Sequence, residues 1–255
     1  MSLVLPDPRW ERPELLYPAI QPTCPVTIDW SDPITEGLKA YILLGNGVHD
    51  LVSGHYATVE SVTDRGTLYD SIDAQGRCLL SDISSNPRIF YHRLMTLLND
   101  SAGTLLCVGR LFSHSTVTET QYPFTAREST SGGNGRMYWG VAGFSGNNGK
   151  ISYSLEDYTA TDTGVSFELN KDLAFGLSWD GSTEYCAYDG QYIHSRAGGN
   201  LTTHPAAFSM VGLVNSSGNY GWDGVQYAYA LWDRHLSEAE NFKFNVAPRH
   251  FLIPS

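Results

Sequence analysis

A glycoside hydrolase needs two carboxylates, one as acid and one as nucleophile or base. Acids of this kind often follow the pattern Glu-x-Asp-x-x-Glu, in which the period of two along a strand places the first glutamate and the aspartate on one face. No glutamate in this sequence has an aspartate two residues later. Glu238 and Glu240 are two apart, but they stand at an expected helix start, where they complement the helix dipole. The spacing of the acidic residues therefore argues against a retaining glycanase.

Other catalytic signatures are also missing. The sequence contains no Gly-x-Ser-x-Gly nucleophile turn, and its glycine-rich segments 45–47 and 132–135 lack the lysine of a phosphate-binding loop. No histidine pair has the His-x-x-x-His or His-x-His spacing of a metal site; His49 and His55 flank a loop and are read as surface residues. The sequence therefore predicts a protein that is not an enzyme, with no catalytic residues and no cofactor.

Calcium and glycans are the remaining ligands to consider. Asp180, Asp189 and Asp223 stand next to glycine in expected turns, where stabilising the turn is the main interpretation; Asp180 and Asp223 are weak metal candidates. Loop aromatics can stack on sugar rings, although in a sandwich they more often pack inside. The candidate glycan contacts are Trp139, Tyr220 and Trp222.

Composition limits the partners. The chain has 255 residues and a net charge of −11, with only 16 lysines and arginines, which are scattered. Binding to nucleic acid or to a membrane surface needs clustered cations, so neither partner is expected. No apolar run is long enough to span a membrane, and the first residues do not resemble a signal peptide. The four cysteines lack Cys-x-x-Cys spacing and are read as free, mostly buried thiols of a reducing cytosol.

Residues 1–29 differ from the rest and are expected to form an extended arm. Six of the 12 prolines lie here, and proline excludes both helix and central strand. The segment is too apolar for a disordered tail. It either folds back over its own body or binds a neighbouring subunit, and the second reading is slightly favoured. The proposed contact residues of the arm are Leu3, Leu5, Trp10, Leu15, Leu16 and Tyr17.

Residues 30–255 are read as one all-β domain, a two-sheet antiparallel sandwich. Short apolar stretches alternate with polar turns, among them Asp180-Gly181 and Asp189-Gly190. Residues 89–99 fit either a strand or a short helix. The expected strands span residues 38–44, 55–62, 78–80, 104–111, 122–126, 136–141, 150–155, 165–169, 172–179, 184–188, 192–194, 208–214 and the last strand, up to Trp232.

The last strand organises the chain. Val225, Tyr227, Tyr229 and Leu231 alternate with a second, largely apolar set, Gln226, Ala228, Ala230 and Trp232, so both faces are expected to be covered. Ser237 and Glu240 then have the Ser-x-x-Glu spacing of a capping box, which predicts one short helix near the C-terminus.

Three segments carry a family resemblance. The stretch from Trp222 to Glu240 and its tail Asn245-Val246-Ala247-Pro248 resemble the end of laminin-G-like, concanavalin A-like jelly rolls, in the variant found among tailed-bacteriophage structural proteins. The segments 30–38 and 177–190 are similar to the first strand and the central hairpin of that group. The resemblance implies a jelly roll that occurs in virions.

The function expected from these observations is a non-enzymatic virion protein, assembled in the host cytoplasm, that decorates or cements the capsid through its arm. Its partners would be other capsid or tail subunits and copies of itself, with a trimer as the expected oligomer. The alternative is a carbohydrate-binding or receptor-binding module of the tail. A polysaccharide-degrading enzyme would need carboxylates from separate strands to converge.

Overall fold

The computed structural model covers residues 1–255. It describes residues 25–44, 48–57, 69–73, 76–81, 89–90, 92–114, 120–127, 136–142, 149–155, 160–201, 205–210 and 222–255. The predicted arm contacts Leu3, Leu5, Trp10, Leu15, Leu16 and Tyr17 lie outside the described residues, as does Tyr220. Their roles stay predictions.

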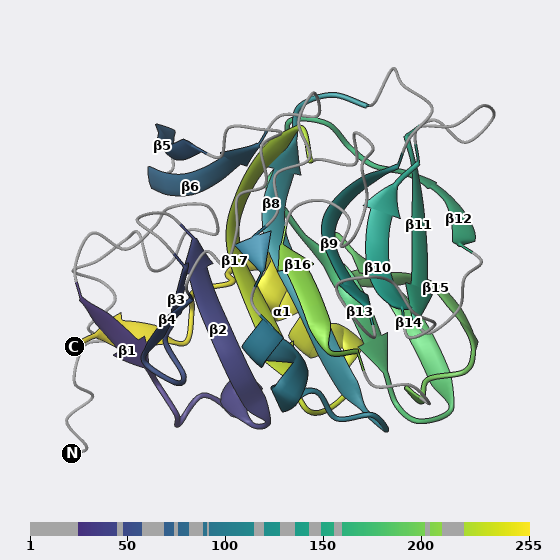
Figure 1. Ribbon diagram of the computed structural model, residues 1–255. Coiled ribbons are helices and arrows are strands. Elements are labelled where there is room, and N and C mark those ends of the chain that lie inside the picture. Colours follow the sequence, from purple (N-terminus) through teal and green to yellow (C-terminus); the bar gives the residue numbers. More distant parts are fainter. Residues whose placement is uncertain are drawn as a thin grey trace, which may run out of the picture.

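The fold is all-β, and in the described part of the chain it has one α-helix, at the C-terminal end (Figure 1). The same residues include two 3-10 helices, Pro33–Thr35 and His92–Leu97. The strands and the helix are β1 (Val26–Ile28), β2 (Leu38–Leu44), β3 (Val48–Asp50), β4 (His55–Ala57), β5 (Tyr69–Asp73), β6 (Gly76–Ser81), β7 (Ile89–Phe90), β8 (Gly103–Leu111), β9 (Gln121–Arg127), β10 (Arg136–Val141), β11 (Lys150–Leu155), β12 (Thr161–Ser166), β13 (Leu173–Trp179), β14 (Thr183–Tyr188), β15 (Gln191–Ala197), β16 (Ala207–Met210), β17 (Gly224–Trp232), α1 (Glu238–Val246) and β18 (Leu252–Pro254).

Two antiparallel sheets form the sandwich. The larger sheet has ten strands in the order β15-β14-β13-β8-β17-β2-β3-β4, with β6 also paired to β17 and β5 to β6. The smaller sheet has six strands in the order β12-β11-β10-β9-β16-β7. A separate pair, β1 and β18, lies at one side of the molecule beside the C-terminus (Figure 1). The predicted two-sheet sandwich is confirmed.

Strand β17 lies in the middle of the larger sheet and is buried along its whole length. Tyr229 and Leu231 belong to the core between the sheets, whereas Tyr227, Ala228, Ala230 and Trp232 belong to a second core on the outer side. The prediction that both faces of this strand are covered is therefore confirmed.

The predicted alternation along β17 is wrong in one detail. Val225 and Tyr227 face the outer core, opposite to Tyr229 and Leu231, because the register with β8 shifts between Gln226 and Ala228. An extra residue at such a bulge exchanges the faces of everything beyond it. Gln226 instead points inward, where its amide donates to the Pro123 carbonyl at 3.1 Å.

Helix α1 and the C-terminal segment cover the outer face of the larger sheet. Phe244 packs against Trp232 with ring centroids 5.2 Å apart, and Phe251 packs edge-on against Tyr41. The Trp232 indole N–H donates to the Ile34 carbonyl at 2.7 Å, which joins β17 to the first 3-10 helix. The outer core thus holds residues from both ends of the domain together.

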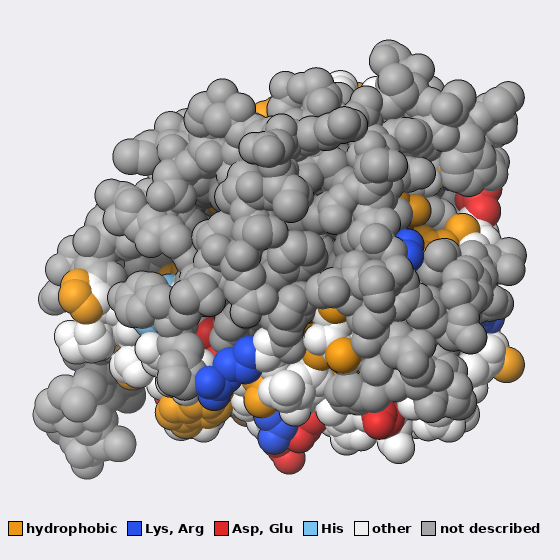
Figure 2. Space-filling view, in the orientation of Figure 1, with side chains coloured by type: hydrophobic (Ala, Val, Ile, Leu, Met, Phe, Trp, Pro, Cys, Tyr) orange, Lys and Arg blue, Asp and Glu red, His pale blue; other side chains and the backbone are white. Residues whose placement is uncertain are grey.

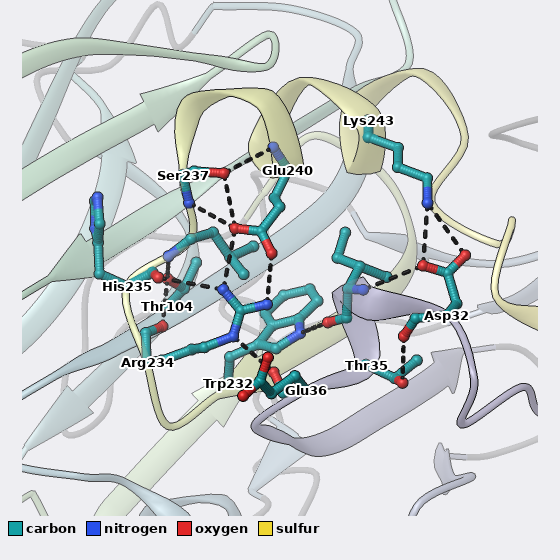
Figure 3. A network of polar contacts seen from close by, with 12 residues as sticks. Asp32, Thr35, Glu36, Thr104, Trp232, Arg234, His235, Ser237, Glu240 and Lys243 are labelled. Atoms are coloured by element: carbon teal, nitrogen blue, oxygen red, sulfur yellow. Dashed lines mark hydrogen bonds and ion pairs between the residues drawn. The ribbon is translucent and has the colours of Figure 1, made fainter.

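The predicted capping box begins α1 (Figure 3). The Glu240 N–H donates to Ser237 Oγ at 3.3 Å, and the Ser237 N–H donates to the Glu240 carboxylate at 2.9 Å. Arg234 donates to the same carboxylate through two nitrogens, at 2.6 and 3.0 Å. This arrangement fixes the turn that connects β17 to α1.

Most predicted strands occur within one or two residues of their expected bounds. The strand expected at 165–169 lies earlier, at β12, and residues 167–170 form the turn that follows it. The ambiguous segment 89–99 contains both alternatives, a two-residue strand and a 3-10 helix. Cys107 and Cys186 are free and buried, as predicted, and burial raises the pKa of both thiols.

Replacing Ser237 with alanine is expected to lower the free energy of unfolding by about 1 kcal/mol, the usual cost of losing a helix N-cap. Urea unfolding followed by circular dichroism measures the change. Ser166→Ala, at an exposed position of β12, is the matched control and should change it by less than about 0.5 kcal/mol. Equal losses in both variants would contradict the capping role.

Candidate functional site

Two of the aromatics predicted to contact a glycan are buried in the core, so that prediction is wrong for Trp139 and Trp222. Both are 0% exposed. Trp139 stacks on Phe175 with ring centroids 4.6 Å apart, and the Trp222 ring lies 5.4 Å from Phe175. Their nearness to loops in the sequence did not reveal that they point between the sheets, where the largest apolar surfaces are buried.

The candidate metal ligands Asp180 and Asp223 have structural roles. The Asp180 carboxylate accepts hydrogen bonds from the Ser182 and Thr183 N–H groups and from the Tyr185 hydroxyl, all at 2.8–2.9 Å. Burial raises its pKa, but these bonds together outweigh that effect and lower the pKa to about 2. Asp223 accepts from the Ser113 hydroxyl. Within the described ranges, no three His, Cys, Asp or Glu residues are grouped as a metal site would require.

A surface pocket lies between the β14–β15 turn and the first turns of α1. Its volume is about 430 Å³, which is within the usual range of small-molecule sites. We call it the helix pocket. It is lined by Gly190, Gln191, Tyr192, Glu238, Ala239 and Phe242.

The β14–β15 turn forms one wall of the helix pocket because Asp189 and Gly190 both adopt positive φ, 51° and 76°. Such a turn suits the Asp-Gly pair that predicted it. A Cβ on Gly190 would lie 3.0 Å from the Phe242 backbone, so only glycine lets the turn approach the helix this closely. Asn245 of the helix donates to the Asp189 carboxylate at 3.0 Å and accepts from the Ala174 N–H.

Phe242 provides the apolar surface of the helix pocket. Phe242 is 56% exposed, and Ala239 lies one turn before it. Val246, one turn further along the helix, is 51% exposed but does not line the pocket. The outward face of α1 therefore carries an aromatic ring that the protein's own core does not use.

Tyr192 joins the helix pocket to an aromatic cluster formed by Tyr185, Tyr192 and His235. The three rings lie 4.5–5.1 Å apart, centroid to centroid. The Tyr192 hydroxyl donates to the Leu236 carbonyl at 2.6 Å, and burial raises its pKa. Tyr192 is consequently held by the same turn that begins α1.

A serine–histidine contact lies beneath this cluster, where His235 Nδ1 is 2.7 Å from Ser178 Oγ. Ser178 also contacts Thr104 Oγ1 at 2.7 Å, and Thr104 accepts from the Leu236 N–H at 3.0 Å. Ser178 is 0% exposed, so its hydroxyl cannot meet a substrate. Burial lowers the pKa of His235. The contact therefore fixes the His235 ring against the tyrosines and is no nucleophile–base pair.

The surroundings of the helix pocket are acidic. Of the described residues that line it, Glu238 alone is charged, and none is a lysine or an arginine. Nearby cations already have partners: Lys171 contacts Asp189 at 2.9 Å, and Arg234 contacts Glu240 at 2.6 Å.

Figure 2 shows one face of the molecule. Along its lower edge, side chains of described lysines or arginines (blue) lie next to those of aspartates or glutamates (red).

The comparisons place the fold among β-sandwich domains. No family model matches the sequence, and no curated protein matches it significantly. Domain 4 of AbnA, an extracellular GH43 arabinanase from Geobacillus stearothermophilus solved in complex with arabinotriose, has a TM-score of 0.57 and 11% identity. The match covers 82% of this chain and 98% of that one.

Two further structures are similar. The binding domain of Paraclostridial Mosquitocidal Protein 1 has a TM-score of 0.55 and 12% identity, over 83% of this chain and 52% of that chain. Trypanosoma rangeli sialidase in complex with sialic acid has a TM-score of 0.52 and 14% identity, over 83% of this chain but 33% of that chain. This chain thus spans about a third of the sialidase. At these identities the likeness establishes a jelly-roll-like sandwich and no more.

Sequence reasoning did not find the helix pocket, because its two walls are about 50 residues apart in the chain. No signal in the sequence pointed to it. Lys243 lies beside both Phe242, which is exposed, and Phe244, which is buried, so polar neighbours in the sequence do not distinguish the two rings.

Among described residues, no helix is long and apolar enough to cross a membrane.

Glu240→Gln is expected to make the free energy of unfolding depend less on pH in the acid range. Burial raises the Glu240 pKa, but the bonds from Arg234 and Ser237 lower it to about 2. A carboxylate with a lowered folded-state pKa stabilises the protein above its unfolded pKa, and this stabilisation is lost as the pH falls from about 4.5 toward 2. The contribution is on the order of 1–2 kcal/mol, since partial exposure screens the pair.

Urea unfolding at several pH values from 2 to 6 measures the Glu240 contribution. Glu238→Gln, in the same helical turn, serves as the control and should keep the wild-type pH dependence. An unchanged acid limb in Glu240→Gln would contradict the assignment.

Proposed function

We propose that this chain is a carbohydrate-binding β-sandwich that holds its glycan in the helix pocket without cleaving it. The observation that carries the proposal is the exposed Phe242 ring, which lies beside polar acceptors in a pocket of about 430 Å³. Binding pockets combine an apolar surface with a few polar groups that fix orientation. The helix pocket has both.

The chemistry of a sugar suits this surface. One face of a pyranose or furanose presents C–H groups, which pack on an aromatic ring, and its rim presents hydroxyls, which donate to oxygen acceptors. Phe242 and Tyr192 supply the rings, whereas Glu238 and Gln191 supply carboxylate and amide oxygens. Tyr192 is fixed through its own hydroxyl, so it loses little freedom when a ligand binds.

The similar structures support this reading over the capsid role. Domain 4 of AbnA was solved with arabinotriose, and a second neighbour is a toxin's binding domain. These ligands and roles belong to those proteins; they reach this chain only as support for the proposal.

The titration of nearby acids favours binding over hydrolysis. A glycosidase needs a carboxyl group whose pKa is raised, so that it carries a proton near neutral pH. Asp180 and Glu240, which both interact electrostatically with His235, have pKa values lowered to about 2. Neither acid holds the proton that bond cleavage requires.

Phe242→Ala is expected to weaken glycan binding about tenfold or more, because the ring supplies the main apolar contact. A glycan array identifies ligands, and isothermal titration calorimetry compares affinities. Val246→Ala, which removes an equally exposed apolar side chain one turn away, is the control and should bind as wild type. A wild-type affinity in Phe242→Ala would place the ligand elsewhere. If the wild-type protein binds no glycan on the array, that result would count against the function.

The virion role expected from the sequence is the second proposal. Trp30 is 58% exposed, and together with Val246 it offers apolar surface to a neighbouring subunit. In this proposal the chain decorates a capsid or tail, binds other virion proteins through the predicted arm, residues 1–29, and associates with copies of itself as a trimer. Residues 1–24 are the part of the arm that precedes Pro25 and β1.

Deletion of residues 1–24 tests the second proposal. Co-sedimentation with the virus particle should be lost, while the melting temperature stays close to wild type because β1 and its pairing with β18 remain. Sedimentation at wild-type occupancy would exclude the arm as the attachment device.

A further inference from the structure

We propose that the helix pocket selects uncharged sugars and rejects acidic ones, such as sialic and uronic acids. The inference rests on the proposed function and names the class of ligand. It follows from the charges that surround the pocket and from the pairing of the neighbouring cations among the described residues with carboxylates of the protein itself.

The negative charge of Glu238 is the first reason to expect this selectivity. Among the described lining residues Glu238 alone carries a charge at neutral pH, and it is exposed at the start of α1. An acidic sugar placed on the Phe242 ring would bring a second negative charge close to this carboxylate. Like charges within a few ångströms repel even near a protein surface. A neutral sugar instead donates hydroxyls to the same oxygens.

Neighbouring cations do not offset this repulsion. Lys171 is already shared between Asp189 at 2.9 Å and Glu168 at 3.1 Å. Arg234 is held by Glu240, and Lys243 of the same helix contacts Asp32 at 3.0 Å. Each of these cations would have to leave a carboxylate before it could bind another.

The start of α1 is the other feature that could attract an anion, since free N–H groups and the helix dipole favour negative charge there. Here the protein's own groups already use part of it. Ser237 Oγ accepts from the Glu240 N–H, and the Glu240 carboxylate accepts from the Ser237 N–H (Figure 3). The Ser237 carbonyl accepts from the Asn241 N–H. Two glutamates in the first turn already balance the dipole.

The selectivity cannot be read from the fold. Domain 4 of AbnA was solved with a neutral oligosaccharide and the sialidase with an acidic sugar, yet both resemble this chain. The likeness in fold therefore does not choose between the ligand classes, and the residues of the helix pocket decide between them.

Matched pairs of neutral and acidic glycans test the inference, for example lactose with 3′-sialyllactose and galactotriose with trigalacturonic acid. Titration calorimetry on the full chain at low and physiological salt gives the ratio of affinities in each pair. The neutral member should bind at least about tenfold more tightly, and the ratio should shrink as salt screens the repulsion. Glu238→Gln should narrow the ratio at least about threefold, since glutamine keeps an acceptor oxygen without the charge.

Glu36→Gln, an exposed charge outside the pocket lining, is the matched control and should leave the ratio unchanged. Equal or tighter binding of the acidic members would overturn the inference and leave the proposed function standing. A ratio that Glu238→Gln does not change would overturn it as well. Failure of every neutral and acidic glycan to bind would overturn the proposed function together with the inference.

Discussion

Burial of β17 on both faces is the constraint on which the rest of this structure depends. A strand whose two sets of side chains are apolar must be covered twice, once by the opposite sheet and once by another layer. Here the second layer is α1 and the C-terminal segment, which place Phe244 and Phe251 over the outer face of the sheet. The position of the helix, and with it the helix pocket, follows from the need to cover Tyr227 and Trp232.

The sequence carried much of the fold because its signals are local. Alternation predicted the strands, Asp-Gly pairs predicted the turns, and Ser237 with Glu240 predicted the start of α1. Signals that depend on three-dimensional packing could not be found in this way. The bulge after Gln226 has no residue signature of its own, and a tryptophan near a loop gives no hint that it points inward, as Trp139 and Trp222 do.

The candidate site shows the same limit more strongly. Its aromatic and acidic residues come from the β14–β15 hairpin and from α1, and only the covering of the sheet by the helix brings them together. The sequence pattern predicts sugar-binding aromatics in loops, whereas the structure places an exposed ring, that of Phe242, on a helix. Its supports are rigid: Tyr192, Asn245 and the turn at Asp189 are each held by hydrogen bonds to neighbouring elements. A site built on such supports is formed before its ligand arrives.

The pairing of β1 with β18 has a mechanical consequence. Val26 lies opposite Pro254, and the Ser255 N–H donates to the Pro25 carbonyl at 3.1 Å, so the two ends of the sandwich leave it at the same point. A force that pulls the two ends apart would break the hydrogen bonds between β1 and β18 one after another, starting at Val26 and Pro254. It would not load all of these bonds at once, as a shearing force does. Stretched by both ends, the protein would release its outermost strands at low force, well before the central sheet gives way.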